Sequence, residues 1–215
     1  MVITVGGSYG SGGKAIAQKL SELLGYKLCD DDIIAEAVKN SGVDLTEETF
    51  RYFDESLGKA PLSELTRVSA IQKSSYLGVV STLSLDVTPL DRTMAQAQRT
   101  VLKRFADEGD CILKGRCADY YLAGREDVLS VFVIDNEENC LSRIMEYYPE
   151  LTEKEAKKLI RKTDKRRQDY YAFFTGKRWG DPANYGLYLN CAMLGGADLA
   201  ARMLAAAVRS SCQEE

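Results

Sequence analysis

After its first methionine the chain reads Val2-Ile3-Thr4-Val5-Gly6-Gly7-Ser8-Tyr9-Gly10-Ser11-Gly12-Gly13-Lys14-Ala15-Ile16-Ala17. The apolar residues up to Val5 predict a buried β-strand, and the apolar positions from Ile16 onward predict an amphipathic helix. Five glycines lie within eight residues between these two segments. A strand, a glycine-rich turn and a helix in this order are typical of a loop that binds phosphate through its backbone amides. The alternative is an ordinary tight turn between a strand and a helix.

The loop departs from the usual phosphate-binding motif in its side chains. That motif is a glycine, four residues, and then Gly-Lys-Ser/Thr. Gly7 and Gly12 have the expected separation, but Gly13 stands where the lysine belongs, and the lysine follows one position later. Ala15 stands near the position of the hydroxyl that binds Mg²⁺. The backbone anion site is still expected, with phosphate contacts from Gly7, Ser8, Tyr9, Gly10, Ser11, Gly12, Gly13, Lys14 and Ala15.

The composition is that of a globular protein and carries no nucleic-acid-binding or membrane-spanning signal. The 215 residues have a net charge of −4, whereas nucleic-acid-binding domains are usually basic. No apolar run approaches the roughly 20 residues that span a bilayer. The chain has six cysteines without a Cys-x-x-Cys pair and has no histidine, so a zinc site is not expected. We expect a cytoplasmic protein with buried, reduced thiols.

Strands alternate with helices along the rest of the chain. Short apolar segments predict strands at residues 26–29, 111–113, 128–134 and 185–189. Helical spacing of apolar residues predicts helices between them, with Asp91 and Asp135 as caps. Thr152 and Glu155 form a capping box before a basic helix. This alternation predicts an α/β fold with a parallel central sheet.

Four segments in the same order resemble the bacterial cytidylate kinase-like proteins, a branch of the nucleoside monophosphate kinase group of P-loop NTPases. They are residues 3–17, 28–34, 111–120, and 164–171 together with Trp179-Gly180-Asp181-Pro182 and 185–190. The resemblance implies one three-layer P-loop domain over residues 1–215, with its core at about 1–35, 93–149 and 181–215. It also implies a helical monophosphate-binding insertion at about 36–92 and a basic helical lid at about 150–180.

The resemblance further implies a reaction, the transfer of the γ-phosphoryl group of ATP, with Mg²⁺, to a nucleoside monophosphate such as cytidylate. Such transfer depends on positioning and charge neutralisation, so the missing histidine is no obstacle. Lys14 would bind phosphate beside the loop amides. Arg116 follows a strand-glycine step, where ligands usually sit, and a Gly-Arg pair in cytidylate kinases faces the acceptor. The alternative for this arginine is a surface salt bridge with Asp119.

The basic helix carries a cluster of cations within two helical turns: Arg161, Lys165, Arg166 and Arg167. A lid needs such cations to neutralise charge on the transferring phosphoryl group. Arg161 and Arg167 are its best candidates for catalysis. The alternative is a solvated basic helix in which Asp164 and Asp169 are internal partners.

Asp30 is expected either as a helix cap or as a carboxylate of the acceptor site or the magnesium shell. Ser11 and Asp30 are the candidate Mg²⁺ ligands because Ala15 has no ligating atom. Arg51 or Arg67 of the insertion could bind the acceptor phosphate, since no arginine follows Asp30 closely.

Two further functions remain open. One is a nucleotide- or phosphate-binding protein with little catalysis, because the loop side chains are altered. The other is a kinase for a different small metabolite. In each case the expected partner is a nucleotide or another small phosphorylated ligand, without nucleic acid or membrane, and a homo-oligomer is left open.

Overall fold

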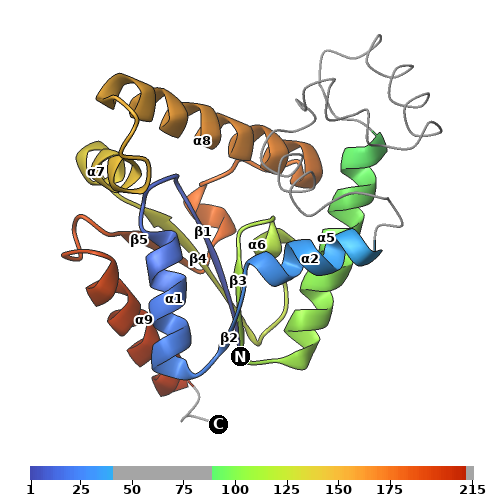
Figure 1. Ribbon diagram of the computed structural model, residues 1–215. Coiled ribbons are helices and arrows are strands. Elements are labelled where there is room, and N and C mark those ends of the chain that lie inside the picture. Colours follow the sequence, from blue (N-terminus) through green and yellow to red (C-terminus); the bar gives the residue numbers. More distant parts are fainter. Residues whose placement is uncertain (41–88, 212–215) are drawn as a thin grey trace. The chain divides into compact units, whose positions relative to one another are not determined.

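The computed structural model describes residues 1–40 and 89–211 of the chain (Figure 1). These residues belong to two compact units, one formed by Met1–Asp30 with Phe105–Glu215 and the other by Asp31–Arg104. The second unit contains α2 (Asp31–Asn40) and most of α5 (Pro89–Glu108). Most of the predicted insertion, including Arg51 and Arg67, lies outside the described residues.

A five-stranded parallel sheet with the order β2-β3-β1-β4-β5 forms the centre of the first unit. The strands are β1 (Val2–Gly7), β2 (Lys27–Cys29), β3 (Cys111–Lys114), β4 (Val128–Ile134) and β5 (Leu187–Asn190). This order places β1 in the middle, hydrogen-bonded to β3 on one side and to β4 on the other. The predicted α/β fold with a parallel sheet is confirmed. The loop after β1 therefore leaves the centre of the carboxyl edge, where α/β proteins bind ligands.

Two helices, α1 (Gly13–Leu24) and α9 (Ala197–Ser211), cover one face of the sheet (Figure 1). Their buried residues form one apolar cluster with strand residues of β1, β3 and β4. Its members include Ile3, Val5, Ile16, Leu20, Ile112, Val131, Val133, Leu204 and Val208. The helical spacing of apolar residues in α1 follows from this contact. The packing fixes the N-terminus of α1 against the sheet.

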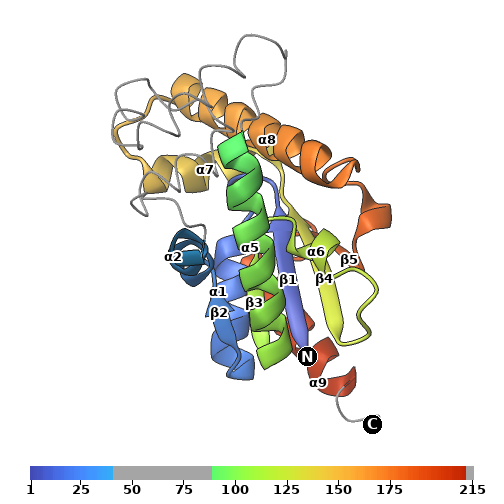
Figure 2. The same ribbon diagram turned by 90° about the vertical axis from the view of Figure 1, so that its right-hand side faces the viewer.

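Two further helices lie at the carboxyl edge of the sheet. α7 (Glu137–Tyr147) follows β4, and α8 (Glu153–Thr175) crosses above the ends of the strands in both views (Figures 1 and 2). The capping box of Thr152 and Glu155 at the start of α8 is confirmed, because each residue accepts a hydrogen bond from the backbone of the other. α8 covers residues 153–175 of the segment, about 150–180, that the resemblance implies to be a lid.

The structure corrects two predicted helix caps. α5 begins at Pro89, so Asp91 lies inside the helix; a proline suits the first helical turn because its φ is already helical and it has no amide to satisfy. Asn136 caps α7 in place of Asp135, accepting a hydrogen bond from the Asn139 amide. Asp135 instead forms an ion pair with Arg143, at 2.6 Å.

Two other sequence expectations concern the thiols and the membrane. The five cysteines that the structure describes are free and buried, as predicted, and Cys212 lies outside the described part. Burial raises the pKa of the Cys140 thiol to about 11. Among the described residues, no helix is both long and apolar enough to cross a membrane.

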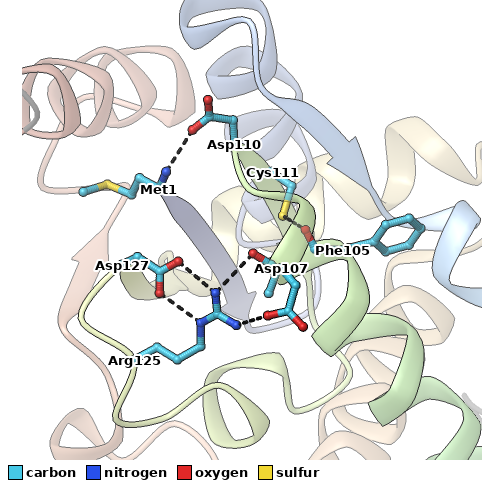
Figure 3. A network of polar contacts seen from close by, with 8 residues as sticks. Met1, Phe105, Asp107, Asp110, Cys111, Arg125 and Asp127 are labelled. Carbon is cyan, nitrogen blue, oxygen red and sulfur yellow. Dashed lines mark hydrogen bonds and ion pairs between the residues drawn. The ribbon is translucent and has the colours of Figure 1, made fainter.

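The amino edge of the sheet carries a network of paired charges (Figure 3). The Met1 ammonium lies 2.8 Å from a carboxylate oxygen of Asp110. The Arg125 guanidinium lies between Asp127, at 2.9 Å, and Asp107, at 2.5 Å. It also donates to the carbonyl of Ala106. These contacts tie together the segments that lead into β1, β3 and β4.

Candidate active site

The glycine-rich loop after β1 has a tight backbone that accepts no side chain at two positions. A Cβ at Gly7 would lie 2.5 Å from the carbonyl oxygen of Val133, and one at Gly10 would lie 2.8 Å from that of Cys140. Gly10 also has a φ of +82°, and Gly12 has a φ of +91°, a region that side chains disfavour. The glycines are therefore required for this fold of the loop.

The loop ends at the N-terminus of α1, whose cap residue Gly12 offers no side-chain hydrogen bond. The first-turn amides of a helix lack intrahelical partners and attract anions. The Ser11 hydroxyl lies in the same loop, with the residue only 1% exposed, and its oxygen has no hydrogen-bond partner. A buried hydroxyl in this state has an uncompensated desolvation cost. The loop thus combines a helix N-terminus with a hydroxyl that a phosphate oxygen or a metal ion would satisfy.

The three residues after Gly12 differ from the usual phosphate-binding motif in their side chains. Gly13 is not sterically required, since a Cβ there would meet Val5 at 3.8 Å, which is ordinary contact. Lys14 and Ala15 are exposed in the first turn of α1. The ammonium of a usual phosphate-binding loop is therefore absent from position 13, although there is room for it.

Two helices of the carboxyl edge hold the loop through charged side chains. On α8, Arg167 donates to the Gly7 carbonyl at 2.8 Å, and its guanidinium lies 5.2 Å from the centre of the Tyr9 ring. Asp164 accepts a hydrogen bond from the Tyr9 amide at 2.8 Å. On α7, Arg143 donates to the Gly10 carbonyl at 2.8 Å. The structure therefore places Arg167, one of the predicted lid residues, in contact with the loop.

A second group of charged residues lies at the ends of β2 and β3. Lys114 lies 3.2 Å from the Asp30 carboxylate, and Arg116 lies 3.9 Å from its other oxygen. The side chain of Arg116 is only 11% exposed, which does not fit the alternative of a surface salt bridge. Asp119 accepts a hydrogen bond from the Tyr171 hydroxyl at 2.6 Å. Asp30 and Arg116, both expected at the acceptor site, are thus brought together.

The ionisation of these groups reflects partial burial. Burial lowers the pKa of Lys114; the carboxylate of Asp30 opposes this shift, while the charges of Arg167 and Arg116 add to it. Burial raises the pKa of Asp164, opposed by the hydrogen bond from Tyr9 and the charge of Arg167. Lys114 therefore lies among like charges, where an anion would be favourable.

The outer part of the basic helix is solvated. Arg161 is 78% exposed, and its closest carboxylate in an ion pair is that of Glu137, at 3.8 Å. Lys165 is paired with Asp169 one turn along the helix, at 2.5 Å. The predicted internal-partner role thus holds for Asp169, whereas Asp164 faces the loop. Among the lid candidates, Arg167 contacts the loop and Arg161 does not share that contact.

Sequence reasoning overlooked Lys114 and Arg143. Lys114 had a visible signal, because it is a charged residue at the end of the apolar strand Cys111-Ile112-Leu113. Arg143 had none, since it is one of several charged residues on α7, and its contact depends on the tertiary structure. Both residues lie at the carboxyl edge beside the loop or its neighbouring strand.

The model of a family described as the cytidylate kinase-like family matches residues 2–192. The chain belongs to the cytidylate kinase-like family. This match confirms the resemblance seen in the sequence. No curated protein matches the chain.

Solved structures show the same fold at low sequence identity. An uncharacterized protein from Eubacterium ventriosum is 21% identical with a TM-score of 0.66, and the alignment covers 98% of this chain and 99% of that chain. The protein TT1252 from Thermus thermophilus is 17% identical with a TM-score of 0.51, covering 97% of each chain. A shikimate kinase from Acinetobacter baumannii, solved with shikimate, is 16% identical with a TM-score of 0.50, covering 98% and 93%. These similarities place this family member in the α/β P-loop kinase fold.

Proposed function

We propose that this member of the cytidylate kinase-like family is an ATP-dependent phosphotransferase whose nominal acceptor is a nucleoside monophosphate such as cytidylate. The observation that carries the proposal is the loop itself. Its tight glycine backbone, the N-terminus of α1 without a side-chain cap and the unsatisfied Ser11 hydroxyl would together form an anion site next to Arg167. Phosphoryl transfer depends mainly on such positioning and charge neutralisation.

Each part of the site has a role in this proposal. The loop amides would hold the phosphates of ATP. Arg167 would approach the transferring group from α8, and Arg161 would join it if α8 closes further. Arg116 would bind the acceptor phosphate because its planar guanidinium suits that geometry. Asp30, held by two cations, would orient Lys114 and Arg116.

Mg²⁺ fits this site through oxygen donors. The buried Ser11 hydroxyl lacks a hydrogen-bond partner, and an oxygen ligand of this kind suits Mg²⁺. Asp30 is the second candidate, and Lys114 and Arg116 already face its carboxylate, so a contact through water is the more favourable arrangement. When bound, Mg²⁺ would neutralise charge on the β- and γ-phosphoryl oxygens.

The altered loop favours a second candidate, a nucleotide-binding protein with little catalysis. Gly13 has no side chain, and Lys14 and Ala15 are exposed. A missing preorganised charge of this kind can lower the rate by a factor on the order of 10²–10³. The third candidate is a kinase for a hydroxylated metabolite, a class that includes the shikimate bound to the solved kinase of similar fold.

The test combines a binding assay with an acceptor screen. Purified protein is titrated with ATP and Mg²⁺ by calorimetry, and ADP formation is then measured with nucleoside monophosphates and with hydroxylated metabolites including shikimate. ADP formation that depends on a nucleoside monophosphate supports the proposal. ATP binding without turnover on any acceptor selects the binding protein, as does activity that first appears in Gly13→Lys. Turnover on a metabolite alone selects the third candidate.

A further inference from the structure

Lys114 leaves the sheet on the face that α1 covers. It is the register partner of Val5 in the neighbouring strand, and Ile112 precedes it by two residues. Residues that are paired in register, or two apart in one strand, point to the same face of a sheet. Val5 and Ile112 both pack in the apolar cluster with α1. The Lys114 side chain therefore starts beneath the helix whose N-terminus closes the loop.

The empty side-chain position of the loop lies above this same face. A Cβ at Gly13 would have Val5 Cγ1 as its nearest neighbour, at 3.8 Å, followed by the Gly6 carbonyl oxygen at 4.0 Å. Val5 is thus the common neighbour of Gly13 and Lys114. In addition, the Gly115 amide donates to the Val5 carbonyl, which fixes the end of β3 against β1. A lysine side chain at position 13 or at position 114 would therefore start close to Val5.

Lys114 is held in an environment that favours an anion. Its side chain is 27% exposed, and its ammonium faces Asp30, whose carboxylate Arg116 also approaches. The nearby charges of Arg116 and Arg167 act on the same ammonium. Asp30 supplies one negative charge to this group of cations. A bound phosphate would add further negative charge beside them.

We propose that Lys114 provides, from strand β3, the ammonium that position 13 of the loop lacks, and that it binds the phosphate chain of the nucleotide. This assignment rests on the proposed function, because it names a phosphate ligand of the same site. Asp30 is then a positioning residue that directs the ammonium. In this arrangement the phosphate-binding ammonium belongs to Lys114 of β3, and position 13 of the loop has no side chain.

The experiment compares four proteins: wild type, Lys114→Met, Gly13→Lys with Lys114→Met, and the control Lys19→Met on the remote part of α1, where Lys19 pairs with Glu22. Binding of ATP with Mg²⁺ and of inorganic pyrophosphate is measured by calorimetry. We expect Lys114→Met to weaken both by about tenfold to a hundredfold, as expected for the loss of a charged hydrogen bond. Gly13→Lys should recover most of this loss, and the control should bind like wild type.

The outcomes separate this inference from the proposed function. If wild type binds and turns over ATP and Lys114→Met binds it equally well, Lys114 is no phosphate ligand and the proposed function stands. If Gly13→Lys recovers nothing, the two positions are not equivalent and the relocation is wrong. If wild type binds neither ATP nor pyrophosphate, both are wrong. Should Lys114→Met fail to fold, Lys114→Gln keeps a donor to Asp30 and gives the same measurement.

Discussion

The two edges of the parallel sheet use the same kinds of charged residue in opposite ways. At the amino edge, Arg125 lies between the carboxylates of Asp107 and Asp127, and the Met1 ammonium lies on Asp110 (Figure 3). The three carboxylates are 48–72% exposed. Water screens such pairs, and they contribute little beyond tying segments together.

At the carboxyl edge two cations share one carboxylate, and that carboxylate is more deeply buried than those of the amino edge. Lys114 and Arg116 face one carboxylate, that of Asp30, with exposed side-chain fractions of 27%, 11% and 22% in that order. Arg167 adds a third charge beside the loop. The amino edge thus pairs each cation with exposed carboxylates, whereas the carboxyl edge gathers three cations near one half-buried carboxylate. Perturbed ionisable groups of the second kind are typical of functional sites.

The largest expected effect comes from placing a methyl group on the loop. Gly10→Ala combines a φ of +82° with a contact of 2.8 Å to a backbone carbonyl, so we expect ATP binding to fall below detection. The matched control at the other edge is Gly124→Ala, with a φ of +86° and no atom within 4 Å. This control should lose only about 1–2 kcal/mol of stability. Calorimetric titration with ATP and thermal unfolding compare the two, and loss of binding in both variants would mean that strain alone is responsible.

The second effect concerns the cation that α8 brings to the loop. Arg167→Ala removes a guanidinium 2.8 Å from the Gly7 carbonyl, and we expect turnover to fall by a factor on the order of 10²–10³. The measurement is the rate of ADP formation at saturating ATP. Arg202→Ala is the control, because Arg202 is 63% exposed on α9 and pairs with Asp198. Unchanged turnover in Arg167→Ala would remove α8 from the active site.

The sequence predicted those features of the two sheet edges that depend on residues close together in the chain. Glycine spacing, apolar runs and the capping box are local, and they predicted the loop, the parallel sheet and the start of α8. Asp30, Arg116 and Arg167 were predicted from their places after a strand or in a basic helix, together with the family resemblance. The Asp164 contact with the Tyr9 amide spans 155 positions, and no local pattern encodes a contact of that kind.

The predicted helix caps also show that a local sequence pattern does not determine which residue makes a given contact. Asp91 and Asp135 both have the right residue type for a cap. A neighbouring residue was better suited in one case, since Asn136 caps α7 while Asp135 pairs with Arg143. Lys14 and Lys114 illustrate it for the site. Adjacency in the sequence favoured Lys14 as a phosphate ligand, and that stays a prediction. Strand pairing adds Lys114, which lies in register with Val5 of β1.

A smaller effect on ATP binding is expected for Asp164, the carboxylate of α8 that contacts the loop. Asp164→Asn removes a negative charge that accepts from the Tyr9 amide, so ATP affinity at neutral pH should rise by up to about fivefold, the effect of about 1 kcal/mol of removed repulsion. Asp169→Asn, an exposed acid of the same helix paired with Lys165, should leave affinity unchanged. Equal affinities of wild type and Asp164→Asn would show that this carboxylate does not oppose the ligand.

The pH dependence gives Asp164 an independent test. Its pKa in the folded protein is raised above the ordinary value of 3.8, so the folded state binds this proton more tightly than the unfolded state. The contribution of the Asp164 carboxyl to the free energy of unfolding is therefore fully present below pH 3.8. It is lost as the pH rises through the raised pKa. Asp164→Asn should lack this loss. Unfolding curves of both proteins across the acidic range measure the difference, and parallel curves would contradict the assigned shift.

The smallest effect on function is expected at the amino edge. Arg125→Ala removes contacts with Asp107, Asp127 and the Ala106 carbonyl, and should lower stability by at most about 1 kcal/mol because the group is partly exposed. Arg125 lowers the pKa of Asp127, so this stability is present above the ordinary pKa of an aspartate and is lost as pH falls through the lowered one. Salt should shrink the difference between wild type and variant. ATP affinity should not change, and a weakened affinity would mean that the two edges are coupled and that charge pairing alone does not distinguish them.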